Sequence, residues 1–280
     1  MTTIVPEATT VGPGQTPVQT GHKLRWAVAD SWTVAWRNIT AMRRVPQVLV
    51  FSTIQPVIFI LMFRYVFGGA IRPQAQYAQF PYVDFLMPGI FVQTIAFGSI
   101  QTGVGLAEDL GKGLIERFRS LPMARSAVLA GRTTADLVRN VFVLVLMLIV
   151  GFAVGFRIHT NVLGLLIAFL VLLLFAFALS WVFATVGLAV GNAEAAQAAA
   201  FPLMAPLVFA SSAFVPIELQ PGWLQVFSAH QPLTLTVNAS RALVLGNGPI
   251  LTPTLQAVAW SIAIIAVFAP LAVSRYRKVA

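Results

Sequence analysis

Residues 163–190 read LGLLIAFLVLLLFAFALSWVFATVGLAV, a run that contains no charged side chain. A bilayer needs about 20 consecutive apolar residues for one helical crossing, so this run is long enough to span a membrane. Its apolar residues are continuous and do not alternate with polar ones, which argues against a strand of a membrane barrel. Backbone groups in lipid must be hydrogen-bonded within their own segment, so the run predicts a transmembrane α-helix.

The whole chain has the composition of a membrane protein. Of its 280 residues, 58% are hydrophobic and 10% are charged, whereas a soluble domain has about 45–50% apolar and 25% charged residues. Five further apolar segments are long enough to cross, and they lie near 47–67, 85–107, 138–156, 197–215 and 255–274. In the segment at 197–215, Pro202 and Pro206 are expected to break the helix. We therefore expect an all-α, polytopic membrane protein with six transmembrane helices.

The N-terminal residues differ from the rest. The first 20 residues contain three prolines, no lysine or arginine and no apolar core. They fit neither a signal peptide nor a membrane span, so we expect a disordered tail at 1–22 and one transmembrane domain at 23–280. The chain has no cysteine, which excludes disulfides, iron–sulfur clusters and thiol nucleophiles.

The distribution of lysine and arginine predicts the orientation, because cytoplasmic flanks of spans collect positive charge. With six spans, both termini and the segment at 108–139 lie on one side, and that side carries 14 of the 18 basic residues. The other side carries Arg64, Arg72, Arg157 and Arg241. Both termini are therefore predicted to be cytoplasmic. Because the basic residues flank spans and form no stripe on a soluble fold, a nucleic-acid partner is not expected.

A helix is expected before the first span, at 24–44. Trp32, Trp36 and Ile39 share one face at helical spacing, among basic residues. Tryptophan favours the headgroup region of a bilayer, so the segment predicts an amphipathic helix along the inner leaflet. Two roles remain open for it, a simple anchor and a part in passing force.

Residues 108–139 form a charged island between two spans. Its centre predicts a short amphipathic helix that Pro122 ends. The apolar face consists of Leu114, Ile115, Phe118 and Leu121, and the polar face of Glu116, Arg117 and Arg119. Apolar side chains among ion-pairing ones at the membrane face suit docking to another protein. The alternative is a loop that only fixes topology.

The segment at 214–248 lies outside by this topology, yet it is too apolar for a free loop. We expect short helices that re-enter the outer leaflet, broken by Pro216, Pro221 and Pro232. Glu218 and Trp223 lie in this segment. A role of Glu218 in touching substrate and a role as a salt-bridged or solvated loop charge both remain open.

Several of these stretches together resemble ABC-2-type export permeases, particularly the daunorubicin-resistance type. The resemblance rests on Glu116-Arg-Phe-Arg-Ser-Leu-Pro122, Gly131-Arg132 and Asp136, on Gln55-Pro-Val-Ile-Phe59 and Phe63-Arg-Tyr-Val-Phe-Gly68, and on Pro221-Gly-Trp-Leu224, Gln231-Pro232 and Arg241-Ala-Leu with Gly246. It runs from about residue 30 to the C-terminus. One departure is Arg64, in a span that is usually wholly apolar there; near the outer end its side chain can reach the interface.

The resemblance implies a six-helix permease half in the bacterial plasma membrane. Its partners would be the lipid bilayer, a second permease half, identical or homologous, and two copies of a cytoplasmic ABC ATPase subunit. The island would be the coupling helix, with Leu114, Ile115, Glu116, Arg117, Phe118, Arg119, Leu121 and Pro122 in contact with the ATPase. Gly131, Arg132 and Asp136 would support this loop.

The expected cargo is an amphipathic drug or lipid-like molecule, with drug, lipid and glycan all open. It would lie between the two halves, against the second and fifth spans. Residues expected along this pathway are Thr94, Gln101, Phe209, Ser211 and Ser212.

The energy source is expected in the partner. The chain contains no Gly-x-x-x-x-Gly-Lys-Ser/Thr phosphate loop, so ATP and Mg²⁺ are expected in the ATPase subunit and no cofactor or metal in this chain.

Two other functional classes fit the sequence less well. An ion-coupled secondary transporter usually buries ionisable residues at mid-span, whereas Asp84, Arg139 and the other candidates lie near span ends. An intramembrane enzyme would need a base beside Ser211 or Ser212, and His230 is the sole candidate. The three histidines form no zinc-peptidase motif.

Overall fold

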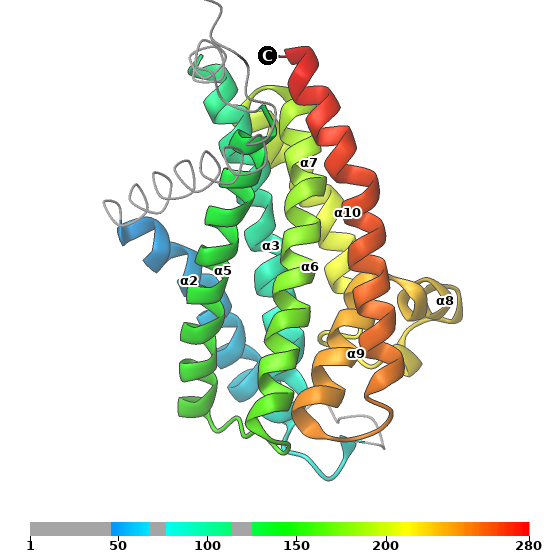
Figure 1. Cartoon of the computed structure of the whole chain (residues 1–280). Coiled ribbons are helices and arrows are strands. Elements are labelled where there is room, and N and C mark those ends of the chain that lie inside the picture. Colours follow the sequence, from blue (N-terminus) through cyan, green and yellow to red (C-terminus); the bar gives the residue numbers. More distant parts are fainter. Residues whose placement is uncertain (1–45, 68–76, 114–124, 280) are drawn as a thin grey trace, which may run out of the picture.

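The computed structural model describes residues 46–67, 77–113 and 125–279, and every regular element within them is helical (Figure 1). The elements are α2 (Pro46–Met62) with a π-helical turn η2 (Phe63–Phe67), α3 (Tyr82–Gly111), α5 (Arg125–Val154), α6 (Val162–Val190), α7 (Ala193–Phe209), the 3₁₀ turn η4 (Ile217–Leu219), α8 (Gly222–His230), α9 (Pro232–Leu245) and α10 (Leu251–Val279). The all-α expectation is confirmed for this part of the chain.

Four of the described helices are long and apolar enough to cross a membrane. They are Tyr82–Gly111, Leu129–Val154, Val162–Val190 and Leu251–Lys278. Thr53–Val66 and Ala193–Phe209 are shorter apolar helices. At 1.5 Å per residue, the 17 residues of α7 extend about 25 Å, less than the roughly 30 Å of a hydrocarbon core. The chain is a multi-pass membrane protein, and the full count of six spans stays a prediction.

Helix α3 is the centre of the bundle. It packs against α2, α5, α6, α7 and α9, and most of its residues are buried. Figure 1 shows α6 in front of α3, with α10 on the other side of α6. Among the four long helices, α3 is the least apolar and the most buried. Most of its polar side chains therefore face protein instead of lipid.

The backbones of α3 and α6 touch where Gly103 meets Gly187. A Cβ atom added to Gly187 would lie 2.1 Å from the carbonyl oxygen of Gly103, and one added to Gly103 would lie 2.3 Å from the carbonyl oxygen of Phe183. Helices in lipid gain no hydrophobic energy from pairing, so their association depends on close packing, which small residues permit. These two glycines fix how closely the two central helices approach.

The prediction that Pro202 and Pro206 break the fifth apolar segment is wrong. Both prolines lie inside α7, which continues from Ala193 to Phe209. Each proline removes one backbone donor, but the remaining bonds of the helix persist, and membrane helices tolerate such a loss when neighbours cover the freed carbonyl. The Asn192 side chain also caps the helix by accepting from the Glu194 amide at 2.8 Å.

Proline marks the starts of the short elements after α7. Pro216 precedes η4, Pro221 precedes α8, and Pro232 is the first residue of α9. Proline suits the first helical turn, because the amide that it lacks would have no partner there. In Figure 1, α8 projects from the side of the bundle, while α9 packs against α10, α6 and α3.

Three other expectations fall outside the described residues. These are the disordered tail at 1–22, the amphipathic helix at 24–44, and the coupling-helix residues at 114–122. All three stay predictions.

The contact of α3 with α6 predicts unequal effects of one substitution at two places in α3. Gly103→Ala forces the two backbones apart, and we expect it to lower the free energy of unfolding by about 1–3 kcal/mol. Gly111→Ala is the matched control, because a Cβ there meets nothing within 4 Å. Thermal unfolding of the purified variants in detergent measures the difference. Equal midpoints for the two variants would contradict the close contact.

Candidate functional site

A charged cluster joins α3 to α5, the two helices that precede and follow residues 114–124 in the sequence. The Asp136 carboxylate, only 5% exposed, accepts a hydrogen bond of 2.6 Å from the Thr102 hydroxyl of α3. It also lies 3.7 Å from Nη1 of Arg139 and 3.9 Å from Nε of Arg132. One carboxylate thus serves two arginines of its own helix and one hydroxyl of the neighbouring helix.

Arg132 extends from α5 across the backbone of α3. Its Nη1 lies 3.3 Å from Oδ2 of Asp109, near the end of α3. A Cβ on Gly105 would fall 1.5 Å from Nη2 of Arg132, so a side chain at 105 would occupy the place of the guanidinium. Gly131, one residue earlier on α5, is buried. The structure thus places Gly131, Arg132 and Asp136 together on α5, while their support of the coupling loop stays a prediction.

The end of α3 carries an exposed ion pair of a different kind. Lys112 donates to Glu108 one turn earlier, and both side chains are more than half exposed. This hydrogen bond with Glu108 raises the pKa of Lys112 above its ordinary value. Positive charge at this end of the helix also complements the helix dipole.

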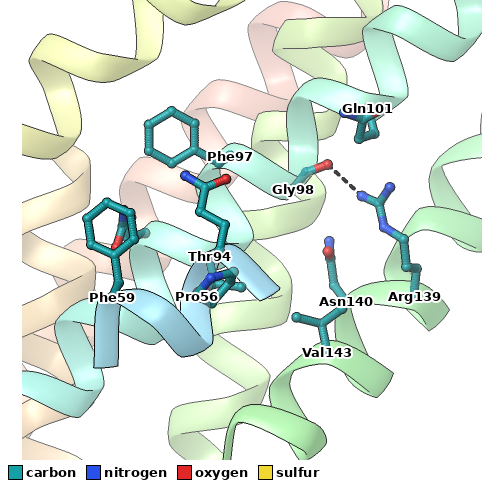
Figure 2. Close-up of a pocket in the computed structure, with 11 residues that line it drawn as sticks. Pro56, Phe59, Thr94, Phe97, Gly98, Gln101, Arg139, Asn140 and Val143 are labelled. Carbon is teal, nitrogen blue, oxygen red and sulfur yellow. Dashed lines mark hydrogen bonds between the residues drawn. The ribbon is translucent and has the colours of Figure 1, made fainter. Parts of the chain in front are cut away.

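A polar pocket opens between α2, α3 and α5, with a volume of about 130 Å³ (Figure 2). Thr94 and Gln101, both expected on the substrate pathway, line it. Arg139 also reaches it, and its Nη2 donates to the carbonyl oxygen of Gly98. The remaining lining residues are Gln55, Pro56, Phe59, Gln93, Phe97, Asn140 and Val143.

Three polar atoms of this pocket are buried without a hydrogen-bond partner among the described residues. They are Oε1 of Gln93, Oγ1 of Thr94 and Nδ2 of Asn140. Buried polar groups in folded proteins nearly always have a partner, and each exception calls for an explanation. The three residues belong to α3 and α5 and all line the pocket. A polar molecule that satisfied them would have to offer a donor to Gln93 and an acceptor to Asn140.

The other expected pathway residues lie elsewhere. Phe209 is at the end of α7 and is 56% exposed. Ser211 and Ser212 are buried, and their hydroxyls donate to the carbonyl oxygen of Val208 and to Oδ1 of Asn238. The five residues therefore divide into a pocket pair, Thr94 and Gln101, and a set at the end of α7. Neither serine hydroxyl is bonded to a histidine in the described structure.

The outer segment is attached to α3 through Arg241. Its Nε donates to the carbonyl oxygen of Phe85 at 3.0 Å, its Nη2 donates to that of Ala213 at 3.1 Å, and its guanidinium lies 3.7 Å from the centre of the Phe85 ring. This residue of α9 is fully buried. The sequence placed it on the outer side and in the family resemblance, but nothing near it in the chain indicates its partners.

Other residues of the outer segment are exposed. Glu218 lies in η4, and Trp223, in the first turn of α8, is 77% exposed. Pro221 and Pro232 stand at helix starts, as described above. An exposed tryptophan of this kind suits an interface between lipid and water.

A second buried carboxylate fixes the start of α3. Asp84 accepts from the backbone amide of Arg157 at 2.8 Å and lies 2.6 Å from Nε2 of His159. It thereby holds the α5–α6 connection against α3. No group of three or more metal-binding side chains occurs in the part of the chain that the structure describes.

Comparison with known proteins gives one family. The model of the ABC-2 type transporter family matches residues 30–245. The chain is 35% identical to a daunorubicin resistance ABC transporter permease of Streptomyces coeruleorubidus over 276 residues, 97% of this chain and 96% of the relative. It is 26% identical to a probable doxorubicin resistance ABC transporter permease of Mycobacterium tuberculosis, over 91% of this chain and 90% of the relative. A putative transport permease of Cyanophora paradoxa is 23% identical, over 77% of this chain and 74% of that protein.

The cluster at Asp136 predicts a large loss of stability when its carboxylate is removed. Asp136→Ala leaves the buried Arg139 without its counter-charge, and breaking such a pair costs about 3–5 kcal/mol. Glu108→Ala is the control. It breaks the exposed ion pair with Lys112 at the end of α3 and should leave the unfolding midpoint unchanged. Unfolding in mixtures of mild detergent and dodecyl sulfate measures both variants. If Asp136→Ala is as stable as Glu108→Ala, the cluster does not hold α3 and α5 together.

Proposed function

The chain belongs to the ABC-2 type transporter family, and we propose that it forms one of two permease halves of an exporter driven by two copies of a cytoplasmic ATPase. The observation that carries this proposal is the 35% identity with a drug-resistance permease over 97% of the chain. The chain is the membrane permease of an ABC transporter and is not itself an enzyme. The proposed cargo is an amphipathic drug or lipid-like molecule that leaves the cell.

Energy would enter through the partner subunit. We place ATP and Mg²⁺ there and no cofactor in this chain, because the phosphate loop is missing from the sequence. Residues 114–122, the proposed coupling helix, join the end of α3 at Gly111 to the start of α5 at Arg125.

The cluster of Arg132, Asp109, Asp136 and Thr102 supports this route of coupling. It bonds Thr102 and Asp109 of α3 to Asp136 and Arg132 of α5, the two helices that flank the coupling segment. A displacement of the segment by the ATPase would therefore move α3 and α5 as a unit. Because α3 lines the polar pocket, the same displacement would reach the proposed substrate pathway.

The orientation follows from the charges and the bundle. Figure 1 shows that the end of α3, the start of α5 and the end of α10 lie at the same end of the bundle. Basic residues gather at this end, with Lys112, Arg132, Arg277 and Lys278 among them. We assign it to the cytoplasm of a bacterial cell, and the ends of α5 and α9 to the outside.

The absence of cysteine allows a direct test of this orientation. Single cysteines at two exposed positions, Lys112 and Gln79, should react from opposite sides of the membrane. In intact cells, a membrane-impermeant maleimide should label the cysteine at 79 and leave the one at 112 unlabelled until the cells are opened. Labelling of position 112 from outside intact cells would overturn the orientation.

Removal of the largest apolar side chain of the coupling helix tests the coupling itself. Phe118→Ala should reduce the amount of ATPase that co-purifies and the ATP hydrolysis that depends on the permease, because loss of an aromatic anchor at an interface often costs about 2 kcal/mol or more. Phe142→Ala makes the same change on an exposed face of α5 and should behave like the wild type.

Further controls separate assembly from insertion. Both variants should reach the membrane at wild-type abundance, and the permease purified alone should bind no nucleotide. Normal assembly and transport by Phe118→Ala would show that the island is only a topogenic loop. Stoichiometric ATP binding by the isolated chain would contradict the division of labour between the subunits.

A further inference from the structure

We infer that the pocket between α2, α3 and α5 binds the anionic head group, a phosphate or a carboxylate, of an amphipathic molecule. The inference rests on the proposed exporter function and assigns a chemical class to its cargo. It rests on the charge of the pocket, on its unpartnered polar atoms, on its size, and on the aromatic side chains beside it.

The charge of the pocket favours an anion. Arg139 is the one charged residue among those that line it, and no carboxylate lines it. Asp136 is the counter-charge of Arg139, with Oδ1 at 3.7 Å from Nη1, but at this distance it makes no hydrogen bond to Arg139. It is also shared with Arg132 and Thr102. Nη2 of Arg139 donates a hydrogen bond to the carbonyl oxygen of Gly98, so the guanidinium has other N–H donors left for a ligand.

The neutral lining residues supply further donors. Amide side chains of Gln55, Gln93, Gln101 and Asn140 surround the pocket, and Nδ2 of Asn140 is buried without an acceptor. Each amide offers two N–H donors, and the unpartnered Thr94 hydroxyl donates as well as accepts. A phosphate or carboxylate presents several acceptor oxygens, so it can accept from Arg139, Asn140 and Thr94 together. It does not satisfy Oε1 of Gln93, which is an acceptor and needs a donor.

The size and surroundings of the pocket favour an amphipathic molecule. A volume of about 130 Å³ leaves room for a head group. Figure 2 shows Phe59 and Phe97 on one side of the pocket and Arg139 and Gln101 on the other. The pocket is therefore aromatic at one side and cationic at the other.

The aromatic side continues out of the pocket. The Phe97 ring lies 6.0 Å from that of Phe201, which is 55% exposed on α7. The Phe59 ring lies 6.2 Å from that of Phe214, which in turn lies 6.1 Å from that of Phe209. Phe214 is buried, so an apolar body attached to the head group would reach the exposed face of α7 along Phe97 and Phe201.

Binding to the permease alone, in nanodiscs of phosphatidylcholine, tests the inference. The probes are three amphiphiles with the same fluorescent acyl chain, one with a phosphate, one with a glucosyl and one with a trimethylammonium head group. We expect the phosphate probe to bind tightest and the cationic probe weakest. Equal or tighter binding of the cationic probe overturns the inference.

Two variants locate the site. Arg139→Gln should weaken binding of the phosphate probe roughly tenfold or more, because it removes a charge-assisted hydrogen bond. Gln101→Glu, at an exposed lining position, should weaken it by a similar factor through repulsion, and it decides the matter if Arg139→Gln does not fold. Gln79→Glu makes the same change outside the pocket and is the control.

Unchanged affinity for the phosphate probe in folded Gln101→Glu protein overturns the site. A carboxylate probe of the same chain length distinguishes a general anion site from one that requires phosphate, and equal binding supports the general site. Assembly with the ATPase is measured separately. Loss of assembly with normal probe binding would contradict the exporter function and leave the pocket assignment standing.

Discussion

The direct contact between the backbones of α3 and α6 is the constraint on which the rest of the structure depends. Gly103 and Gly187 bring the two helix axes together, and α3 is then enclosed by five other helices. The same helix repeats this device along its length. Gly89 admits the backbone of Ala213, and Gly105 admits the guanidinium of Arg132. A helix without side chains at these positions can be approached by partners on several faces, which is how α3 becomes the axis of the bundle.

Enclosure of α3 explains where the polar side chains are. Asp84, Thr102 and the carbonyl oxygen of Phe85 all belong to α3, and each is bonded to a residue of a different segment. Lipid offers no water that could replace these hydrogen bonds. Each bond therefore favours the helix packing in which its partner residue is present. Some buried polar atoms have no partner within the described residues, and three of them belong to residues that line the pocket. This grouping sets the pocket apart as a place for a ligand.

Hydropathy predicted the helical class and the positions of the apolar helices, but the span expected at 138–156 starts later than the apolar helix Leu129–Val154. Arg132 and Asp136 lower the hydropathy of its first turns, yet their side chains are paired with α3. Pairings of this kind join residues 23–34 positions apart and leave no periodic pattern in the sequence. Thr94 and Gln101 could be chosen from their polarity within a span, whereas Arg139 seemed only a topogenic charge. The partners of Arg241 could likewise not be predicted, because they lie up to 156 positions away in the sequence.

The late partners of α3 have a consequence for how the chain is made. A polypeptide leaves the ribosome from its N-terminus, so α3 emerges before every segment that satisfies its polar groups. Asp84 must wait for His159, and the carbonyl of Phe85 must wait for Arg241. Because α3 is also the least apolar of the long helices, it is the one that lipid alone accepts least readily. Until α9 has been translated, the long helix that lipid accepts least readily is therefore also the one around which the bundle will form. The bundle then closes around α3 from the C-terminal side.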